Sequence, residues 1–334
     1  MFNHASILIT GGTGSLGNAI LPRLLNEYNP KKVIIYSRDE MKQWEMQKKF
    51  ANDPRVRFFI GDVRDQNRLR RALRGVDYVI HAAATKIVPT AEYNPFECIK
   101  TNIDGAMNVI EASLDTGVKK VVALSTDKAS SPINLYGATK LASDKLFVAA
   151  NAYSGKGGTS FCVVRYGNVL GSRGSVIPLF LQQAAAKENK LTVTDKRMTR
   201  FMITLDEGVD LIFKAFADSL GGEIYVKRIQ SMNIIDIAKS VDAEATIETI
   251  GIRPGEKLHE QMIGLEDAPY TYKYDGYYKI LPAINDWSKD VDRIKDGEKV
   301  QSEFVYSSDN NDEWMTVDYL QDWILKNKST FLDI

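Results

Sequence analysis

Residues 7–20, ILITGGTGSLGNAI, join an apolar strand to the start of a helix through a glycine-rich turn. Gly11, Gly14 and Gly17 let the main chain turn tightly and approach a pyrophosphate, which the free amides and the dipole of a helix N-terminus attract. Because the turn lies at the first strand–helix junction, it predicts a nucleotide-binding loop rather than an ordinary tight turn. The residues expected to contact the nucleotide are Gly11, Thr13, Gly14, Ser15, Leu16 and Gly17.

Five further apolar runs alternate with helical patterns after this strand. They are short and apolar nearly throughout, as expected for strands of a parallel sheet that helices cover on both faces. The pattern predicts an α/β fold, a Rossmann-type doubly wound parallel sheet. The five runs are residues 32–38, 56–62, 76–83, 119–126 and 160–167.

One intervening helix can be predicted in detail within residues 94–117. Asn94 is expected at its N-cap, Pro95 at its first position and Gly117 at its C-terminal stop. Apolar residues at intervals of three and four predict a single buried stripe. That stripe comprises Phe96, Ile99, Ile103, Met107, Ile110 and Leu114.

The regular alternation breaks after about residue 165, where Gly-, Pro- and Arg-containing loops separate shorter elements. We therefore assign residues 1–165 to the nucleotide-binding domain and residues 166–334 mainly to a smaller, interleaved C-terminal substrate-binding domain. A long amphipathic helix and an apolar strand within residues 203–228 indicate that the chain returns to the first domain there.

Composition narrows the functional classes. The chain has 334 residues, and its 43 basic and 43 acidic residues cancel, so no overall field favours nucleic acid or anionic lipid. Cys98 and Cys162 lack metal-ligand spacing, so we expect buried reduced thiols and no metal site. Neither a secretion signal nor a run of about 18 apolar residues is visible, which predicts a cytoplasmic protein that does not span a membrane.

The end of the second strand indicates which nucleotide binds. Many NAD-binding units place a carboxylate there to accept a hydrogen bond from the ribose 2′-hydroxyl, whereas this chain has Ser37 and Arg38, with Lys42 one helical turn later. A cation and a hydroxyl suit a 2′-phosphate, so NADP is the expected cofactor. The alternative is that Asp39 binds the 2′-hydroxyl and Arg38 is a solvated surface charge.

Two later strand ends complete the expected cofactor wall. Asp62 and Val63, at the end of the third strand, are expected to flank the adenine, although Asp62 could equally cap a helix. Ala82 lies in HAAA, residues 81–84, where small side chains leave room for the cofactor.

Residues 124–140, LSTDKASSPINLYGATK, concentrate polar chemistry after another strand. The spacing of Tyr136 and Lys140 places both on one helix face, where the ammonium can stabilise a tyrosinate and hold a ribose hydroxyl of the cofactor. Thr126 can donate a hydrogen bond to a substrate oxygen that is being oxidised. The phenol of Tyr136 is therefore the expected general base.

At this point the sequence resembles the extended short-chain dehydrogenase/reductase family, through TGGTGSLG, HAAA, STDK, YGATK and RYGNVLGSRGSVIP. The resemblance covers nearly the whole chain. The combination of TDK with SPINLYGATK, RMTRFMITLDE and GIRPGEKLHE is similar to the inverting UDP-N-acetylglucosamine 4,6-dehydratases, the 5-epimerising enzymes that begin pseudaminic acid synthesis in flagellated bacteria. Related glucose-nucleotide dehydratases carry Thr-Asp-Glu where this chain has Thr126-Asp127-Lys128.

This resemblance implies a reaction in three stages. Tyr136 takes the O4 proton while hydride leaves C4, and the resulting ketone makes the C5 proton removable. Lys128 then takes that proton, Asp127 protonates O6, and water leaves before hydride returns to C6. Lys128 must therefore be neutral and Asp127 protonated when elimination starts.

The same resemblance implies a site for a UDP-sugar. Arginines suit its diphosphate because a planar guanidinium donates two parallel hydrogen bonds. Lys86, beside the cofactor wall, is expected to contact both ligands. The substrate-binding residues that the resemblance implies are Lys86, Asn168, Val176, Ile177, Thr194, Met198, Arg200, Arg253 and Glu256.

Other functions fit the same motifs. A UDP-hexose C4 epimerase needs the glycine loop, Tyr136 and Lys140 but not Asp127 or Lys128, and a retaining dehydratase gives the other C5 configuration. A non-catalytic NADP sensor or scaffold is possible because a fold does not dictate a function. Relatives often self-associate, so a homo-oligomer, a dimer or a hexamer, is expected.

Overall fold

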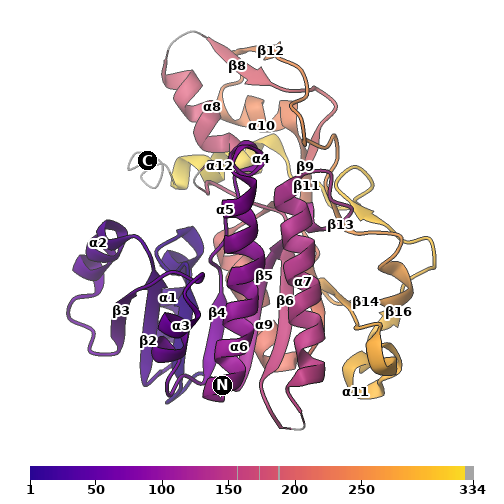
Figure 1. Cartoon of the computed structure of the whole chain (residues 1–334). Coiled ribbons are helices and arrows are strands. Elements are labelled where there is room, and N and C mark those ends of the chain that lie inside the picture. Colours follow the sequence, from indigo (N-terminus) through magenta and orange to yellow (C-terminus); the bar gives the residue numbers. More distant parts are fainter. Residues whose placement is uncertain (156, 173, 187–188, 328–334) are drawn as a thin grey trace.

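The computed structural model describes residues 1–155, 157–172, 174–186 and 189–327, and a ten-stranded sheet forms the centre of this part of the chain (Figure 1). In spatial order the strands are β16 (Glu298–Lys299), β14 (Thr271–Tyr274), β15 (Tyr277–Ile280), β10 (Ile224–Lys227), β6 (Ser160–Tyr166), β5 (Lys120–Thr126), β4 (Tyr78–His81), β1 (Ser6–Thr10), β2 (Lys32–Ser37) and β3 (Val56–Ile60).

The strands from β10 to β3 run parallel, and all six strands predicted in the first half of the chain are present. The predicted α/β, doubly wound fold is therefore confirmed. Strand order reverses at β1, which lies between β4 and β2. In such sheets ligands bind outside the carboxyl ends of the strands at this reversal, so the glycine turn after β1 is correctly placed for a nucleotide.

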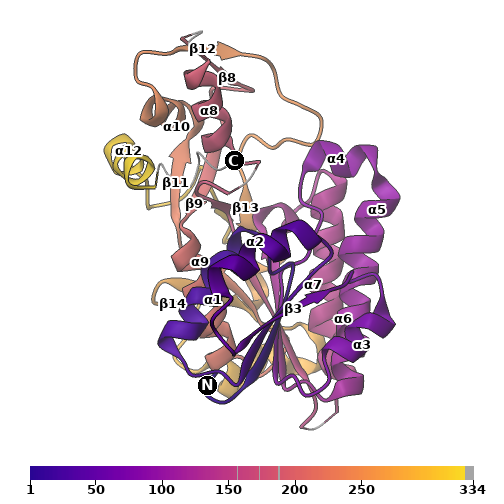
Figure 2. The same cartoon turned by 90° about the vertical axis from the view of Figure 1, so that its left-hand side faces the viewer.

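Helices cover both faces of the sheet, with α1 and α9 on one face and α3, α6 and α7 on the other (Figure 2). Aliphatic side chains of the strands between them, such as those of Ile7, Ile9, Val121 and Val163, are fully buried. The bounds are α1 (Ser15–Glu27), α2 (Glu40–Phe50), α3 (Gln66–Ala72), α6 (Gly105–Thr116), α7 (Leu135–Tyr153) and α9 (Leu205–Asp218).

The helix predicted within residues 94–117 is present, but a π-helical turn interrupts its regular repeat. It forms α5 (Pro95–Ile99), a π-helical turn η1 (Lys100–Asp104) and α6, after the short helix α4 (Val88–Tyr93). Gly117 ends α6 in the left-handed conformation (φ 71°), as predicted. Asn94 takes the N-cap position, but its side chain does not cap α5; its Nδ2 donates to Thr90 O instead.

The predicted buried stripe on this segment is confirmed only near its C-terminal end, where Ile110 is buried and Leu114 packs against the core. Phe96 is 75% exposed and Met107 40% exposed. Small residues such as Gly105 and Ala106 face the interior, where a Cβ on Gly105 would lie only 2.8 Å from a Val63 methyl carbon. The π-turn adds a residue to the helical repeat, so the positions before and after it do not share one face of the helix.

A second, smaller group of elements lies beyond the carboxyl end of the sheet, which we call the C-terminal lobe. Its core includes Phe180, Leu191, Met232, Ile237 and Leu320. Its elements are β7 (Asn168–Val169), α8 (Val176–Ala185), β8 (Lys190–Val193), β9 (Thr199–Ile203), β11 (Gln230–Asn233), α10 (Ile234–Val241), β12 (Thr246–Thr249) and α12 (Val317–Lys326).

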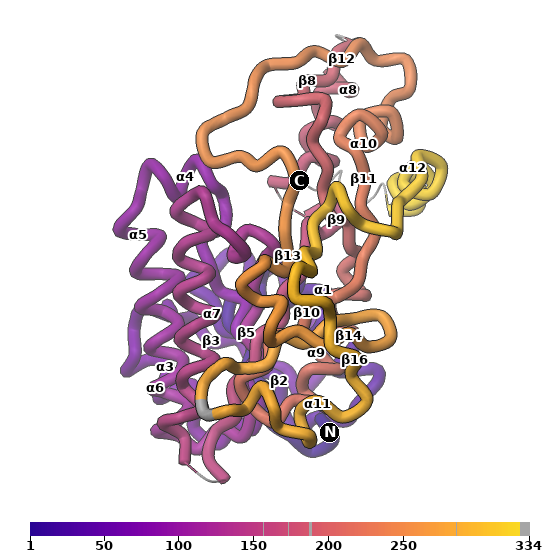
Figure 3. The backbone as a smooth tube through the Cα atoms, turned by 90° about the vertical axis from the view of Figure 1, so that its right-hand side faces the viewer, coloured from indigo at the N-terminus to yellow at the C-terminus, as the bar shows by residue number. Residues whose placement is uncertain are grey.

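The chain passes between the lobe and the large sheet several times (Figure 3). It leaves the lobe after β9, adds α9 and β10 to the sheet, and returns at β11. It later adds the antiparallel strands β15, β14 and β16, which the sequence analysis did not include. The remaining elements are η2 (Asp127–Ala129), β13 (Gln261–Ile263), η3 (Ala268–Tyr270), η4 (Ile284–Lys289), α11 (Val291–Ile294) and β17 (Tyr306–Ser307).

Two expectations from composition can be compared with the fold. Cys98 and Cys162 are buried free thiols, as expected. Over the described ranges, no helix has both the length and the apolar composition needed to cross a bilayer.

Candidate active site

A cavity of about 1050 Å³ opens at the carboxyl ends of the parallel strands, with walls from both the sheet and the C-terminal lobe. It brings together most of the residues predicted for the cofactor, the chemistry and the substrate. The predicted residues in its wall are Gly11, Thr13, Gly14, Ser15, Leu16, Ser37, Arg38, Lys42, Asp62, Val63, Ala82, Lys86, Thr126, Lys128, Tyr136, Lys140, Asn168, Val176, Arg200, Arg253 and Glu256.

Five predicted residues lie outside this wall. Gly17 supports the loop from behind, Asp127 is fully buried behind Lys128, and Ile177 and Met198 belong to the core of the C-terminal lobe. Thr194 donates a hydrogen bond to Met198 Sδ at 3.0 Å. Wall residues that the sequence analysis did not name include Tyr166, Gly167, Ser172 and Glu260.

The glycine turn requires residues without side chains for two different reasons. Gly11 has φ +63°, and a Cβ there would lie 2.8 Å from Ala83 N. At Gly17 a Cβ would lie 2.0 Å from Gly12 O, so this glycine allows α1 to pack closely against the turn. Gly14 precedes α1 without a side-chain cap, which leaves the helix N-terminus available for an anion.

The end of β2 and the start of α2 hold the residues that were expected to select the nucleotide. Ser37 and Thr13 share a hydrogen bond between their hydroxyl oxygens at 2.9 Å. Asp39 caps α2 by accepting from Lys42 N, and its carboxylate also pairs with Lys42 Nζ at 3.0 Å. Arg38 is 64% exposed and lies 3.8 Å from an Asp62 oxygen, so its guanidinium remains accessible to a ligand.

Asp62 and Val63 have different surroundings at the end of β3. Partial burial would raise the pKa of Asp62, but the hydrogen bond from Arg64 lowers it below its usual value. Asp62 therefore stays ionised beside the cavity, and Val63 packs against Gly105 on α6.

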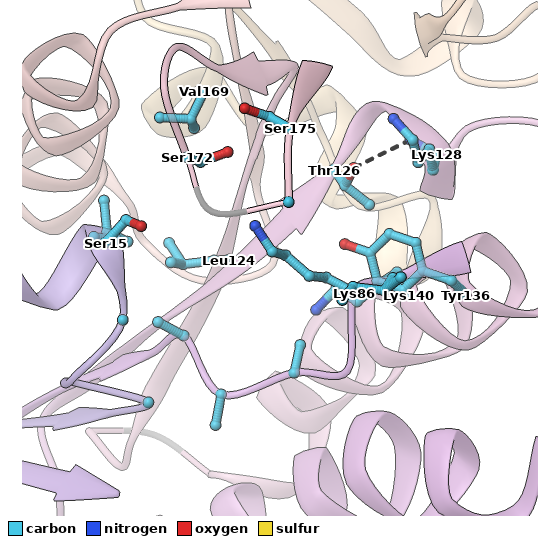
Figure 4. Close-up of a pocket in the computed structure, with 18 of the residues that line it drawn as sticks. Ser15, Lys86, Leu124, Thr126, Lys128, Tyr136, Lys140, Val169, Ser172 and Ser175 are labelled. Atoms are coloured by element: carbon cyan, nitrogen blue, oxygen red, sulfur yellow. Dashed lines mark hydrogen bonds between the residues drawn. The ribbon is translucent and has the colours of Figure 1, made fainter. Parts of the chain in front are cut away.

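The stretch predicted to carry the chemistry folds into a strand end, a tight turn and a helix start. Thr126 ends β5 and caps the turn η2 by accepting from Lys128 N at 3.4 Å (Figure 4). Asn134 caps α7 by accepting from Gly137 N at 2.7 Å. A Cβ on Gly137 would lie 2.2 Å from Lys128 O, so the helix that carries Tyr136 packs directly against the main chain of Lys128.

Lys128 lies between two buried carboxylates. Its Nζ is 3.0 Å from Asp127 Oδ1 and 3.1 Å from Glu260 Oε1, and it also donates to Asn168 Oδ1 at 3.4 Å. Thr126 Oγ1 donates to the same Asp127 oxygen at 2.9 Å. Since a hydroxyl has one proton, Thr126 can donate either to Asp127 or to a substrate oxygen, but not to both at once.

The pKa of Asp127 shifts in the direction that the reaction was expected to need, but the pKa of Lys128 shifts in the opposite direction. Burial raises the pKa of Asp127, which favours the protonated acid, as required. Burial alone would lower the pKa of Lys128, but the carboxylates of Asp127 and Glu260 raise it above its usual value. The expectation of a neutral Lys128 is thus contradicted for this arrangement, in which Lys128 is an ammonium.

Tyr136 and Lys140 are both buried and both line the cavity. The hydroxyl of Tyr136 points towards Thr126 (Figure 4). Burial raises the pKa of Tyr136 to about 12, although Lys128 opposes this shift. Burial lowers the pKa of Lys140, while Asp144, one turn later on α7, acts in the other direction.

The two arginines expected at the diphosphate differ in how far their guanidinium groups are already engaged by the protein. Arg200 donates from Nη1 to Thr199 O and Leu258 O, and from Nη2 to Lys257 O. Arg253 is half exposed, and its nearest ion pair is Glu256 at 3.9 Å. Arg253 is therefore the better placed of the two to bind a diphosphate.

Glu260 is the charged residue of the site that sequence reasoning missed. It ends the motif GIRPGEKLHE, in which Arg253 and Glu256 had been singled out. A carboxylate immediately before an apolar strand was the available signal, because a charge that is about to be buried needs a partner.

Comparisons with known proteins agree with this geometry. A family model described as "Polysaccharide biosynthesis protein" matches residues 7–282. The chain is 56% identical over 319 residues to the UDP-N-acetylglucosamine 4,6-dehydratase (inverting) of Campylobacter jejuni serotype O:2, with 94% of this chain and 95% of that protein covered. It is 45% identical over 288 residues to the UDP-glucose 4-epimerase of Rickettsia akari, with 84% of each covered.

Solved structures show the same architecture. Pen from Bacillus thuringiensis superposes with a TM-score of 0.89 at 37% identity, covering 98% of this chain and 99% of that one. DesIV, a dTDP-glucose 4,6-dehydratase from Streptomyces venezuelae with NAD and TYD bound, superposes with a TM-score of 0.66 at 25% identity, covering 76% of this chain and 86% of that one. The chain therefore belongs to the extended short-chain dehydrogenase/reductase family, in the polysaccharide biosynthesis group that includes the inverting UDP-N-acetylglucosamine 4,6-dehydratases.

Proposed function

We propose that this protein is an NADP-dependent lyase, an inverting UDP-N-acetylglucosamine 4,6-dehydratase. Its product is UDP-2-acetamido-2,6-dideoxy-β-L-arabino-hex-4-ulose, and the proposed role is the first step of pseudaminic acid synthesis. One observation carries the proposal: Lys128 and Tyr136 line the cavity that the glycine turn also lines, and Lys128 Nζ lies 3.0 Å from Oδ1 of the buried Asp127. The inverting relative, 56% identical over nearly the whole chain, supports the same reaction.

The wall near α2 supports NADP over NAD. The bound relative DesIV carries NAD, so a nicotinamide dinucleotide suits this family. In this chain Asp39 is already engaged by Lys42 N and Nζ, whereas Arg38 remains accessible. An accessible guanidinium and an engaged carboxylate favour a 2′-phosphate over a 2′-hydroxyl.

The chemistry begins with the conversion of the C4 hydroxyl to a ketone. A nicotinamide cofactor supplies, when bound, a hydride acceptor for C4 and later a hydride donor for C6. Tyr136 takes the O4 proton in its tyrosinate form, which the charge of Lys128 favours, and the C4 ketone then makes the C5 proton acidic because the carbanion becomes an enolate. Lys128 takes that proton, Asp127 gives its proton to O6, and the C6–O6 bond breaks to release water.

Lys128 becomes a base through its contact with Asp127. A shift of one proton from Nζ to Oδ1, across 3.0 Å, converts the ammonium and carboxylate into an amine and a carboxylic acid without changing the net charge. Elimination then restores the ion pair. The proton that Tyr136 took from O4 balances the proton that C5 gains from the face opposite Lys128, so one turnover releases no proton.

Product analysis tests the function directly. The purified protein with NADP is incubated with UDP-N-acetylglucosamine in deuterated water, and the product is examined by mass spectrometry and NMR. We expect a 4-keto-6-deoxy sugar that carries deuterium at C5, with coupling constants of the L-arabino configuration. The opposite C5 configuration would identify a retaining dehydratase instead.

The rival C4 epimerase has support of its own, because a relative named UDP-glucose 4-epimerase is 45% identical. An epimerase returns hydride to C4 and does not touch C5. A galacto product without C5 deuterium would therefore replace the dehydratase proposal. A protein that binds NADP but forms no product would favour a sensor or scaffold.

Assembly and location complete the proposal, which places a homo-oligomer, a dimer or a hexamer, in the cytoplasm. Tyr93, Phe96 and Met107 are exposed along α4, α5 and α6. Exposed apolar side chains on neighbouring elements support self-association. Light scattering of the eluting protein measures the number of chains, and a monomer at micromolar concentration would contradict this part.

A further inference from the structure

Glu260 is a charged group at the cavity that the reaction above does not use. It precedes β13, lines the cavity, and has a side chain that is only 4% exposed. Its Oε1 contacts Lys128 Nζ at 3.1 Å and lies 3.9 Å from Arg200 Nε. Its second oxygen, Oε2, is buried without a hydrogen-bond partner in the described part of the chain.

The main chain around Glu260 is held firmly. Glu260 N donates to Ser308 Oγ at 2.9 Å, and Ser308 N donates back to Glu260 O at 2.8 Å. Ser308 Oγ in turn shares a hydrogen bond with Thr199 Oγ1 at 2.6 Å. Since Thr199 precedes Arg200 on β9, one network positions both the carboxylate and its guanidinium partner.

Asp127 and Glu260 share one ammonium, but their surroundings shift their pKa values in opposite directions, upwards for Asp127 and downwards for Glu260. Asp127 is fully buried, and Lys128 is its cationic partner. Glu260 faces Lys128, Arg200 and Lys257, and these cations offset the effect of burial on it. When two carboxyls are pushed apart in this way, one acts as the acid and the other remains an anion.

We propose that Glu260 is a positioning residue of the dehydratase reaction: its permanently ionised carboxylate, held beside Arg200, fixes Lys128 Nζ next to Asp127 and keeps one proton shared within the Asp127–Lys128 pair. This inference rests on the proposed function. Without Glu260, the cations Arg200 and Lys257 and the burial of Lys128 would together favour loss of that proton to water.

The role of Glu260 follows from the place where positive charge develops during elimination, which is Lys128 Nζ. In the elimination step the C5–H bond breaks and its proton bonds to the Lys128 amine, while Asp127 transfers its proton to O6 and the C6–O6 bond breaks. A positive charge thus forms on Nζ, 3.1 Å from a carboxylate that is already in place. A fixed counter-charge in a buried site stabilises such a transition state because it does not have to reorganise. Glu260 itself neither gains nor loses a proton in this step.

The pH dependence of kcat with saturating NADP and UDP-N-acetylglucosamine tests the proposal. Four proteins are compared: the wild type, Glu260→Gln, Glu260→Asp and the control Glu266→Gln, which removes an exposed carboxylate from the same segment. Removal of the Glu260 charge lowers the pKa of Lys128, which loses an anionic partner, and of Asp127, which loses a like-charged neighbour. Tyr136 also faces this cluster, but Lys128 and Asp127 are the members of the cluster whose charges shift its pKa most.

In Glu260→Gln we therefore expect both limbs of the pH profile to move to lower pH by about one unit or more. We also expect kcat at the optimum to fall about 100-fold. Glu260→Asp keeps a charge at a greater distance and is expected to show an intermediate shift. Glu266→Gln is expected to match the wild type.

A residue that only supports the fold would lower kcat or stability without moving the limbs. Limbs of Glu260→Gln that coincide with those of the wild type, or an equal shift in Glu266→Gln, overturn the proposal. If Glu260→Gln fails to fold, as judged by loss of NADP binding, the Asp variant decides by the same criterion. A wild type that forms no dehydrated product defeats the proposed function instead, which keeps the two failures distinct.

Discussion

Asn134 Nδ2 donates a hydrogen bond to the main-chain oxygen of Gly255 at a distance of 2.8 Å. Asn134 caps α7, the helix of Tyr136, and Gly255 belongs to the loop that carries Arg253 and Glu256. One side chain therefore ties the helix of the chemistry to the loop proposed to hold the diphosphate.

Asn134→Asp is expected to separate these two roles. Aspartate still caps α7, so the free energy of unfolding should stay within about 0.5 kcal/mol of the wild type. It cannot donate to Gly255 O, and the loss of one hydrogen bond predicts a KM for the UDP-sugar about 3- to 10-fold higher, with unchanged NADP affinity. Asn134→Ala should add a loss of about 1 kcal/mol in stability. An unchanged KM in Asn134→Asp would show that this link does not position the loop.

Gly137→Ala is expected to damage both stability and activity. The new Cβ would lie 2.2 Å from Lys128 O, a main-chain atom that cannot move aside without displacing Lys128. We expect a loss of about 1–3 kcal/mol, measured by urea unfolding, and a larger proportional loss of kcat. Gly208→Ala in α9 is the matched control, because its nearest neighbour atom is 3.9 Å away. That change should be neutral or slightly stabilising.

Lys128→Ala is expected to abolish product formation while NADP binding is retained. The amine that collects the C5 proton is removed, so kcat should fall at least about 1000-fold. Lys145→Ala, a solvent-facing change on α7, is the control and should leave turnover unchanged. Turnover and NADP affinity are measured on the same preparations. Normal turnover in Lys128→Ala would remove this residue from the mechanism.

Arg38→Ala is expected to reduce the preference for NADP. A charge-assisted contact with the 2′-phosphate contributes about 1.5–3 kcal/mol, so the ratio of NADP to NAD affinity should fall about 10- to 100-fold. Titration calorimetry with both cofactors measures this ratio. Arg70→Ala, which removes a guanidinium from the far side of α3, should leave it unchanged. An unaltered ratio in Arg38→Ala would reassign the ribose contact to Asp39.

Asp218→Asn is expected to destabilise the protein at neutral pH and much less in acid. Asp218 accepts from Tyr225 and pairs with the buried Lys279 and with Lys295. Burial would raise its pKa, but these partners lower the pKa to about 2. The carboxylate thus contributes stability that is fully present above about pH 4 and is lost as pH falls towards 2.

The expected loss for Asp218→Asn at pH 7 is about 3 kcal/mol, because Lys279 keeps a buried charge without its main partner. Urea unfolding at pH 7, 5 and 3.5 should show the difference from the wild type shrinking only at the lowest pH. Asp210→Asn breaks an exposed pair with Arg23 and should cost no more than about 1 kcal/mol. A difference that persists unchanged at pH 3.5 would contradict the proposed origin.

The local features of the fold could be predicted because each has a cause within a few residues. The parallel strands are apolar along most of their length, and the turn at Gly11 needs a residue that tolerates φ +63°. The stop at Gly117 follows from the same conformational freedom. The buried stripe on residues 94–117 was mispredicted at Phe96 and Met107 because a pattern that assumes 3.6 residues per turn does not reveal a π-turn.

The parts of the site that were missed depend on contacts between distant segments. Glu260 meets Lys128 only because β13 lies next to the turn η2, and no spacing within either segment encodes that approach. The same contact reversed the expectation for Lys128: its own burial favours the amine, but a carboxylate from elsewhere in the chain favours the ammonium.

The edges of the large sheet have a consequence for how two copies of the chain can meet. At one edge, β16 contains only Glu298 and Lys299, both exposed. At the other edge, β3 carries the outward-facing charge of Arg57. Short or charged edge strands resist pairing with a strand from another molecule, which is the contact that leads to continuous β-aggregates. Assembly of this protein should therefore proceed through helical surfaces, and a stable complex should leave each sheet as a separate ten-stranded unit.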